Sequence, residues 1–101
     1  MWDSIPMSIA KNHMPEPERT MMSEFRAVLG ERIRSLREER GYSQLAFSKK
    51  AMMSREMLRR IEQGTVSLAA DRLPRIAAEL GVSVVELLVG VEKIHIPERE
   101  S

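Results

Sequence analysis

The sequence predicts an all-α fold, a compact domain of five helices joined by short connections. Between residues 25 and 88, apolar residues recur at three- and four-residue spacing, which is the period of amphipathic helices. Serines that can cap a helix precede three of these stretches, and glycines that can end a helix follow three of them. Alternating Val, Ile and Tyr are scarce, so a β fold is not expected.

The first helix is expected over residues 23–40, where Gly41 stops it after a basic last turn. Its apolar residues are spaced four, four and three positions apart and share one face: Phe25, Leu29, Ile33 and Leu36. The fourth helix is expected over residues 72–80, with Asp71 as its cap and Pro74 in its first turn.

Ser43, Ser54 and Ser83 open the other three helices, because each hydroxyl can accept from a free backbone N–H. An apolar residue before each serine can pack on the fourth helical residue as a hydrophobic staple. These pairs are Tyr42 with Phe47, Met53 with Leu58, and Val82 with Leu87. The helices expected after the caps span residues 44–50, 55–63 and 84–89.

Two tails are expected around a domain at residues 23–90. Prolines interrupt residues 1–22, which suggests either a flexible leader or an arm whose polar content is Lys11, Asn12 and His13. Residues 91–101 form a polar C-terminal tail that contains three apolar side chains, Val91, Ile94 and Ile96.

Positive charge is local in this chain, although the net charge is only +1. Residues 24–90 hold 12 Lys and Arg against 9 Asp and Glu, a net +3. Residues 43–64 hold five basic groups against Glu56 and Glu62. Because screening limits each charge to its neighbourhood, this segment can attract a phosphate backbone.

Several classes of function are not expected. The chain has no cysteine, which excludes disulfides and cysteine zinc sites and is compatible with the cytoplasm, the expected location. No apolar run is long enough to span a membrane. His13 and His95 are isolated, and no nucleophile–base pair or glycine-rich phosphate loop is present. We therefore expect no cofactor, no metal and no enzymatic activity.

The second and third expected helices are joined by only about four residues, 51–54, which forces a steep crossing of the helix-turn-helix type. Here the chain resembles the lambda-repressor/Cro-like (XRE-type) helix-turn-helix family over residues 25–90. The matching residues are Ser43-Gln44, Phe47-Ser48, Ala51, Met53-Ser54, Leu58, Ile61-Glu62 and Gly64, with Leu29 to Arg37 before them and Ile76 to Leu87 after them. The resemblance implies a transcription regulator, expected to be a repressor, that binds double-stranded DNA with its third helix in the major groove.

The resemblance also implies roles for individual residues. Base contacts fall to Arg55, Glu56 and Arg60. Phosphate contacts fall to Gln44, Ser54, Gln63, Thr65 and Ser67, and Arg59 is expected to add phosphate affinity. Arg37 and Glu62 match an ion pair between the first and third helices. The alternative to DNA contact is that these residues form an ordinary solvated helix face, on which Glu56 pairs with Arg60 at i, i+4.

Two residues depart from the family pattern. Met52 stands where the family usually has glycine, so a left-handed turn there would carry strain. Ser48 stands where alanine is favoured, and its hydroxyl would need a helical carbonyl one turn back.

Apolar residues crowd the end of the domain, which predicts a homodimer through Val85, Leu88, Val89 and Val91. The alternative is that Val85 and Val89 pack on the first helix or the N-terminal segment of the same chain. Two related functions stay open on the same fold: an antitoxin that binds a toxin, and a controller of a restriction–modification operon.

Overall fold

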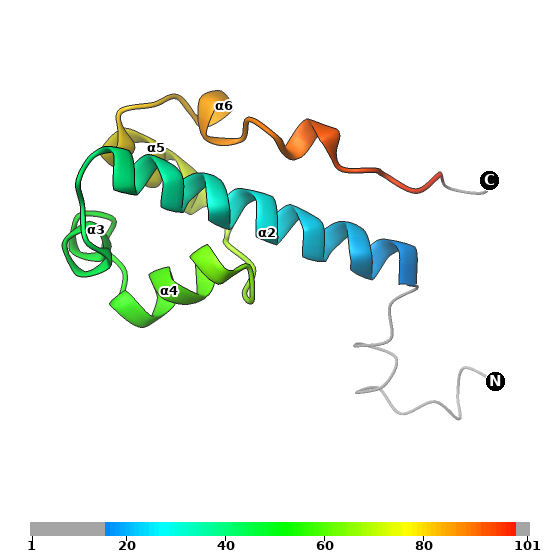
Figure 1. Cartoon of the computed structure of the whole chain (residues 1–101), viewed down its shortest axis with the longest axis horizontal. Helices are drawn as coiled ribbons and strands as arrows, with labels where there is room; N and C mark the ends of the chain where they lie inside the picture. The colour runs from blue at the N-terminus through cyan, green and yellow to red at the C-terminus, as the bar shows by residue number, and fades with distance from the viewer. Residues whose placement is uncertain (1–15, 99–101) are drawn as a thin grey trace.

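Five α-helices and two short 3-10 helices make up the computed structural model over the residues that it describes, 16–98, and these residues contain no strand. The expected all-α fold of five helices is therefore confirmed. The elements are α2 (Glu16–Glu39), α3 (Gln44–Lys50), α4 (Arg55–Gln63), η2 (Ala70–Arg72), α5 (Leu73–Leu80), α6 (Val84–Leu87) and η3 (Val91–Lys93). In Figure 1, α2 runs through the molecule with α3 and α4 on one side and α6 and the C-terminal segment on the other.

The helix α2 begins at Glu16, seven residues before the expected start, so the expected tail is wrong for residues 16–22. Pro17 lies in the first turn, where its missing N–H removes no helical hydrogen bond. Glu16 accepts from Arg19 at 2.8 Å and from Thr20 at 2.9 Å. Glutamates in a first turn also favour a helix start, because their negative charge is attracted to the positive N-terminal end of the helix dipole. The suggested arm at residues 11–13 lies outside the described residues.

All three expected serine caps are confirmed. The hydroxyls of Ser43, Ser54 and Ser83 each accept from the backbone N–H three residues later, at 3.0 Å. The first staple is also present, because the rings of Tyr42 and Phe47 lie 5.9 Å apart. These local contacts explain why α3 and α4 have the expected bounds.

The start of α5 and the end of α6 differ from expectation. Asp71 does not cap α5, because the 3-10 helix η2 precedes it and α5 has no side-chain cap. The N–H of Arg72 instead donates to the carbonyl of Ala69 at 3.0 Å, so a backbone turn supplies the partner. The helix α6 ends at Leu87, two residues early, and the chain turns through Gly90 at φ 107°.

Both departures from the family pattern occur as expected. Met52 has φ 58°, in the left-handed region, and its side chain is exposed. The buried hydroxyl of Ser48 donates to the carbonyl of Leu45 at 2.8 Å. The turn between α3 and α4 therefore keeps its shape at the expense of local strain at Met52.

The core lies where α2, α3, α4, α5 and α6 meet. Its largest fully buried apolar side chains are Ile33, Phe47, Leu58, Ile76, Leu80 and Leu87. Gly30 allows α2 to touch α4 backbone to backbone, because a Cβ there would lie 2.2 Å from the carbonyl oxygen of Ile61. The core therefore holds α4 rigidly against the long helix, which fixes the exposed face of α4.

The expected C-terminal tail is partly structured. Residues 91–93 form η3, which packs on α2, and a Cβ on Gly90 would lie 3.3 Å from Cγ1 of Val28. The side chains of Val91, Ile94 and Ile96 turn toward α2 and form one wall of a groove. No helix in the described part of the chain is both long and apolar enough to cross a membrane.

Candidate DNA interface

The helices α3 and α4 cross steeply after a link of four residues. The link runs from the C-cap Ala51 to the N-cap Ser54. In Figure 1, α3 is seen nearly end-on while α4 lies in the plane of the view. This is the geometry of a helix-turn-helix, in which the second helix can enter the major groove with its N-terminus toward the bases.

A buried ion pair holds α4 to α2. Nε of Arg37 lies 2.7 Å from Oε2 of Glu62, and Nη2 lies 3.1 Å from Oε1, so the pair is bidentate. The two side chains are 8% and 3% exposed. Nη1 of Arg37 also donates to the carbonyl of Tyr42 at 2.7 Å, just before α3. One guanidinium thus connects α2, α3 and α4 below the exposed face.

Gln44 also belongs to this network, and the sequence analysis did not predict that role. Its Nε2 donates to Oε1 of Glu62 at 3.0 Å, so the carboxylate receives three donors. The family resemblance had implied only a phosphate contact for Gln44. A carboxamide has two N–H donors, and the bond to Glu62 uses one of them.

The three expected base-contacting residues are all exposed on α4. Arg55 has no ion-pair partner among the described residues. Glu56 accepts from Nε of Arg60 at 3.0 Å and also pairs with Arg59. The i, i+4 pair between Glu56 and Arg60, which the alternative of a solvated helix face predicted, is therefore present.

The expected phosphate-contacting residues surround this face, and each has a local role as well. Ser54 caps α4, and Gln63 accepts from Nη1 of Arg59 at 3.1 Å. The hydroxyl of Thr65 donates to the carbonyl of Arg60 at 3.2 Å, next to the left-handed C-cap Gly64. Ser67 lies farther away, at the edge of the groove beside α2.

Further basic residues lie in the helix-turn-helix or contact it. Lys49 and Lys50 are exposed in the last turn of α3, and Nζ of Lys50 lies 5.6 Å from the centre of the Tyr42 ring. Nη1 of Arg72 donates to the carbonyl of Met52 at 3.4 Å, so this side chain contacts the turn between α3 and α4. The two lysines were part of the basic segment that the sequence analysis identified at residues 43–64. Arg72 lies outside that segment, so the sequence did not indicate that it contacts the turn.

Hydrogen bonds from Arg59 and then Arg60 lower the pKa of Glu56 from 4.5 to about 2. A lowered pKa means that the ionised carboxylate stabilises the folded state above pH 4.5, and that this contribution is lost as the pH falls toward 2. An NMR pH titration of the free protein should therefore give a Glu56 midpoint near 2. In an Arg59→Ala, Arg60→Ala variant the midpoint should return toward 4.5, and an unchanged midpoint would contradict this cause.

The fold and the exposed face of α4 define a helix-turn-helix protein. A family model for helix-turn-helix proteins matches residues 33–87, which is more than half of the chain. The chain belongs to the XRE-type helix-turn-helix family of DNA-binding transcription regulators.

Solved structures of other regulators have a similar fold. The clp gene regulator ClgR from Corynebacterium glutamicum aligns with a TM-score of 0.64 and 25% identity, over 67% of this chain and 72% of that one. A hypothetical transcription factor, NHTF from Neisseria, aligns with a TM-score of 0.62 and 26% identity, over 76% and 83% of the two chains. A search of curated proteins finds no match.

Proposed function

We propose that this protein is a sequence-specific regulator of transcription that reads the major groove with α4. Arg55 and Arg60 donate to guanine, and Glu56 selects against other bases by accepting from cytosine and repelling phosphate. The expected effect on transcription is repression, because a bound domain blocks access to the DNA that it covers. The protein acts through binding and needs no catalytic site.

One observation carries this proposal: the N-terminus of α4 is exposed while its opposite face is locked to α2. Glu62 is 3% exposed and Leu58 is fully buried, whereas Arg55, Glu56 and Arg60 are exposed. A rigid support of this kind fixes the positions of the base-reading side chains to the accuracy that bidentate contacts need.

The phosphate contacts are proposed for the residues around that face. Gln44 uses its second N–H donor for a phosphate, with its carboxamide held in place by Glu62. Ser54, Arg59, Gln63, Thr65 and Ser67 are proposed to supply the other contacts. Because such contacts carry no base information, they raise affinity for all sequences alike.

The test is to select bound DNA from a random pool and then compare variants on the selected site. Arg55→Ala should cost about 1–3 kcal/mol of binding free energy and relax preference at one base position. Gln44→Ala should weaken binding to all sequences similarly. Arg75→Ala on α5 removes the same charge outside the helix-turn-helix and should leave specificity unchanged. Parental affinity in Arg55→Ala would show that α4 does not read the bases there.

A homodimer is part of the proposal, because two half-sites one helical turn apart give more specificity than one. Its surface is proposed to include Val85, Leu88, Val89 and Val91. Val85 is 78% and Val89 is 51% exposed, so the described part of the chain leaves most of Val85 and half of Val89 uncovered. Leu88 and Val91 are half-buried, and they are expected to support this surface from below.

A further inference from the structure

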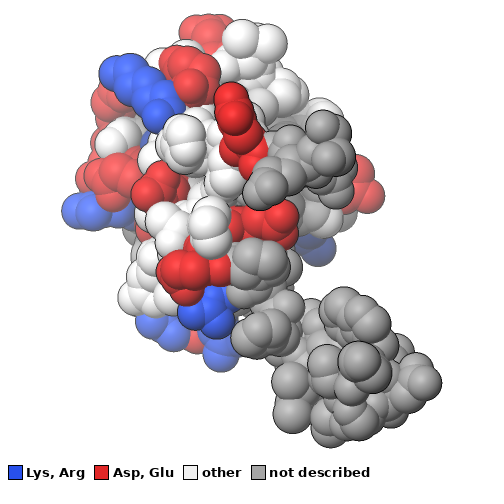
Figure 2. All heavy atoms as spheres, turned by 90° about the vertical axis from the view of Figure 1, so that its right-hand side faces the viewer, with Lys and Arg blue, Asp and Glu red and all other residues white. Residues whose placement is uncertain are grey.

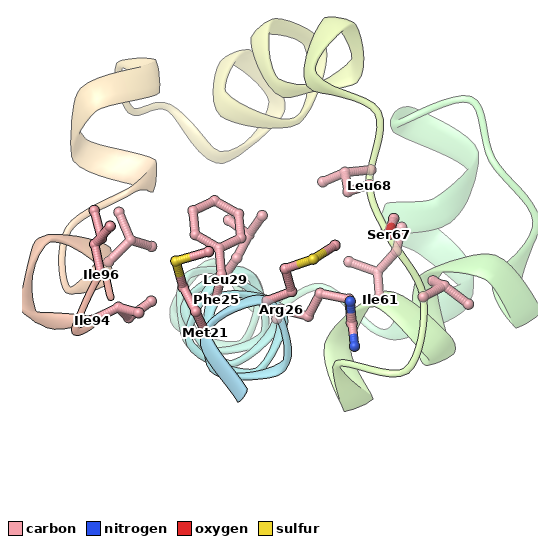
Figure 3. Close-up of a pocket in the computed structure, with 13 residues that line it drawn as sticks. Met21, Phe25, Arg26, Leu29, Ile61, Ser67, Leu68, Ile94 and Ile96 are labelled. Carbon is pink, nitrogen blue, oxygen red and sulfur yellow. The ribbon is translucent and has the colours of Figure 1, made fainter. Parts of the chain in front are cut away.

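An apolar groove of about 480 Å³ runs along the N-terminal half of α2. We call it the α2 groove. Residues 66–68 form one wall and the C-terminal segment at residues 94–96 forms the other, with α2 as the floor (Figure 3). Figure 3 shows Met21 and Phe25 rising from α2 into this space. Arg26 is the only charged residue that lines it among the described residues, and its Nε donates to the C-cap carbonyl of α4 at 3.4 Å.

The floor of the α2 groove is apolar and largely uncovered. All the buried residues of α2 lie at Leu29 or beyond, although the helix starts at Glu16. Met22 is 39% and Phe25 is 40% exposed, and Ile96 on the rim is 73% exposed. A continuous exposed apolar surface of this kind marks an interaction site, and methionine side chains adapt to partners of different shapes.

The α2 groove lies apart from the base-reading end of α4. Ile61, near the C-terminus of α4, lines the groove, whereas Arg55 and Glu56 lie at the other end of that helix. In Figure 1, the first half of α2 extends away from α3 and from the N-terminus of α4. Of the side chains assigned to DNA, only Ser67 lines the groove. A molecule bound there would therefore leave the N-terminus of α4 accessible.

The charges around the α2 groove favour a positively charged occupant. Figure 2 shows more acidic than basic side chains on the described surface at this end of the molecule. Residues 16–28 and 91–98, which frame the groove, contain five glutamates and three Lys or Arg residues. Glu18 and Glu24 are exposed and have no ion-pair partner within the described part of the chain. Nucleic acid and a second copy of the chain are both disfavoured here, because each would add negative charge.

The backbone around the α2 groove favours a helical occupant over an extended one. An extended peptide binds by pairing with the exposed edge of a sheet, and residues 16–98 contain no strand. A helix satisfies its own backbone hydrogen bonds and needs only an apolar face to lie in a groove. The floor from Met22 to Leu29 is about 11 Å long, which matches two turns of a bound helix.

We propose that the α2 groove binds a basic amphipathic helix of a different protein. Apolar side chains at positions i, i+3 or i+4 and i+7 of that helix pack on Met22, Phe25 and Leu68, and Lys or Arg on its flanks lies beside Glu18 and Glu24. This inference goes beyond the proposed function, because it gives the regulator a protein contact in addition to its DNA contact. Two helical turns cover far less than the roughly 800 Å² per partner of a standard interface, so the complex is weak and reversible.

A synthetic leucine–lysine peptide of about four helical turns, with its leucines on one face, serves as the probe. It is labelled with fluorescein and titrated with the full chain, and fluorescence anisotropy gives the dissociation constant. We expect a value on the order of 10–100 μM. One control peptide has glutamate in place of every lysine, and another has the same composition with leucines on all faces. Each control should bind about tenfold more weakly, because it lacks either the charge or the apolar face.

Substitutions in α2 test whether the probe lies in the groove. Phe25→Ser removes a ring from the floor and should weaken binding of the leucine–lysine peptide about tenfold. Glu18→Gln should weaken it about threefold, because an exposed charge pair contributes little. Glu39→Gln removes an equally exposed and unpaired charge near the other end of α2 and should change nothing. Thermal unfolding followed by circular dichroism checks that each variant is folded.

The remaining outcomes would overturn the proposal. Equal affinity of the parent and Phe25→Ser for the probe would exclude the α2 groove, and equal affinity for the leucine–glutamate peptide would exclude a basic occupant. Self-association of the parent that Phe25→Ser abolishes in sedimentation equilibrium would show that a second copy fills the groove. Shielding of Trp2, the only tryptophan, from acrylamide in the parent but not in Phe25→Ser would show that residues 1–15 fill it.

Discussion

Glu62→Gln should lower the free energy of unfolding by about 3–5 kcal/mol, because it leaves the buried guanidinium of Arg37 with only the exposed Glu38, 3.8 Å away, as a counter-charge. Arg37 is 8% exposed at its side chain, so water cannot replace the lost partner. A domain of ordinary stability has about 5–15 kcal/mol in total, so the loss would be a large fraction of it. Urea unfolding followed by circular dichroism measures the change.

The matched control for this substitution is Glu56→Gln on the same helix. Glu56 pairs with Arg59 and Arg60 in contact with solvent, so its loss should lower the free energy of unfolding far less than Glu62→Gln does. Equal midpoints for Glu62→Gln and the parent would mean that the buried pair adds no net stability. Replacing both partners by apolar residues, Arg37→Met with Glu62→Leu, should be less harmful than Glu62→Gln alone.

Gly30→Ala should destabilise the domain by about 1–3 kcal/mol, although alanine is the better helix former by about 1 kcal/mol. The added Cβ would lie 2.2 Å from the carbonyl oxygen of Ile61 and 2.9 Å from that of Glu62. Both atoms belong to the backbone, so α2 and α4 must move apart. Thermal unfolding gives the loss, and the amide NMR shifts of residues 61 and 62 report the movement.

Ser23→Ala, in an exposed position on the same helix, separates helix propensity from the contact. It should stabilise α2 slightly or leave the melting temperature unchanged. A Gly30→Ala variant that melts above the parent would show that α2 and α4 can separate without loss. If Gly30→Ala folds, it should also bind its operator more weakly, because the support of α4 is displaced.

Local rules account for the parts of the fold that the sequence predicted well. The bounds of α3 and α4 follow from Ser43, Ser54 and Gly64, because caps and stops act within one helical turn. The strained turn at Met52 was likewise readable from the family pattern. The Arg37–Glu62 pair was predicted from the same pattern, and both hydrogen bonds of this bidentate pair are present. The assigned DNA contacts stay predictions.

The errors arose where a local signal has two meanings. Pro17 was taken as one of the interruptions, but a proline in the first turn of a helix is tolerated because the N–H that it lacks would have no helical partner there. Asp71 has the right chemistry for a cap, but the backbone N–H at the start of α5 bonds to the carbonyl of Ala69 in the turn of η2 instead. Sequence patterns do not decide between such alternatives, since each is locally acceptable.

The sequence by itself determined the helical class, the cap positions and the location of the helix-turn-helix, because these depend on residues within a few positions of each other. Only the tertiary structure decided how Gln44 is oriented, how closely Gly30 lets α4 approach, and where the segment after Gly90 lies. Each of these contacts joins residues at least 18 positions apart or depends on the path of a whole segment. Their geometry follows from packing around the shared core, which no single stretch of the chain specifies.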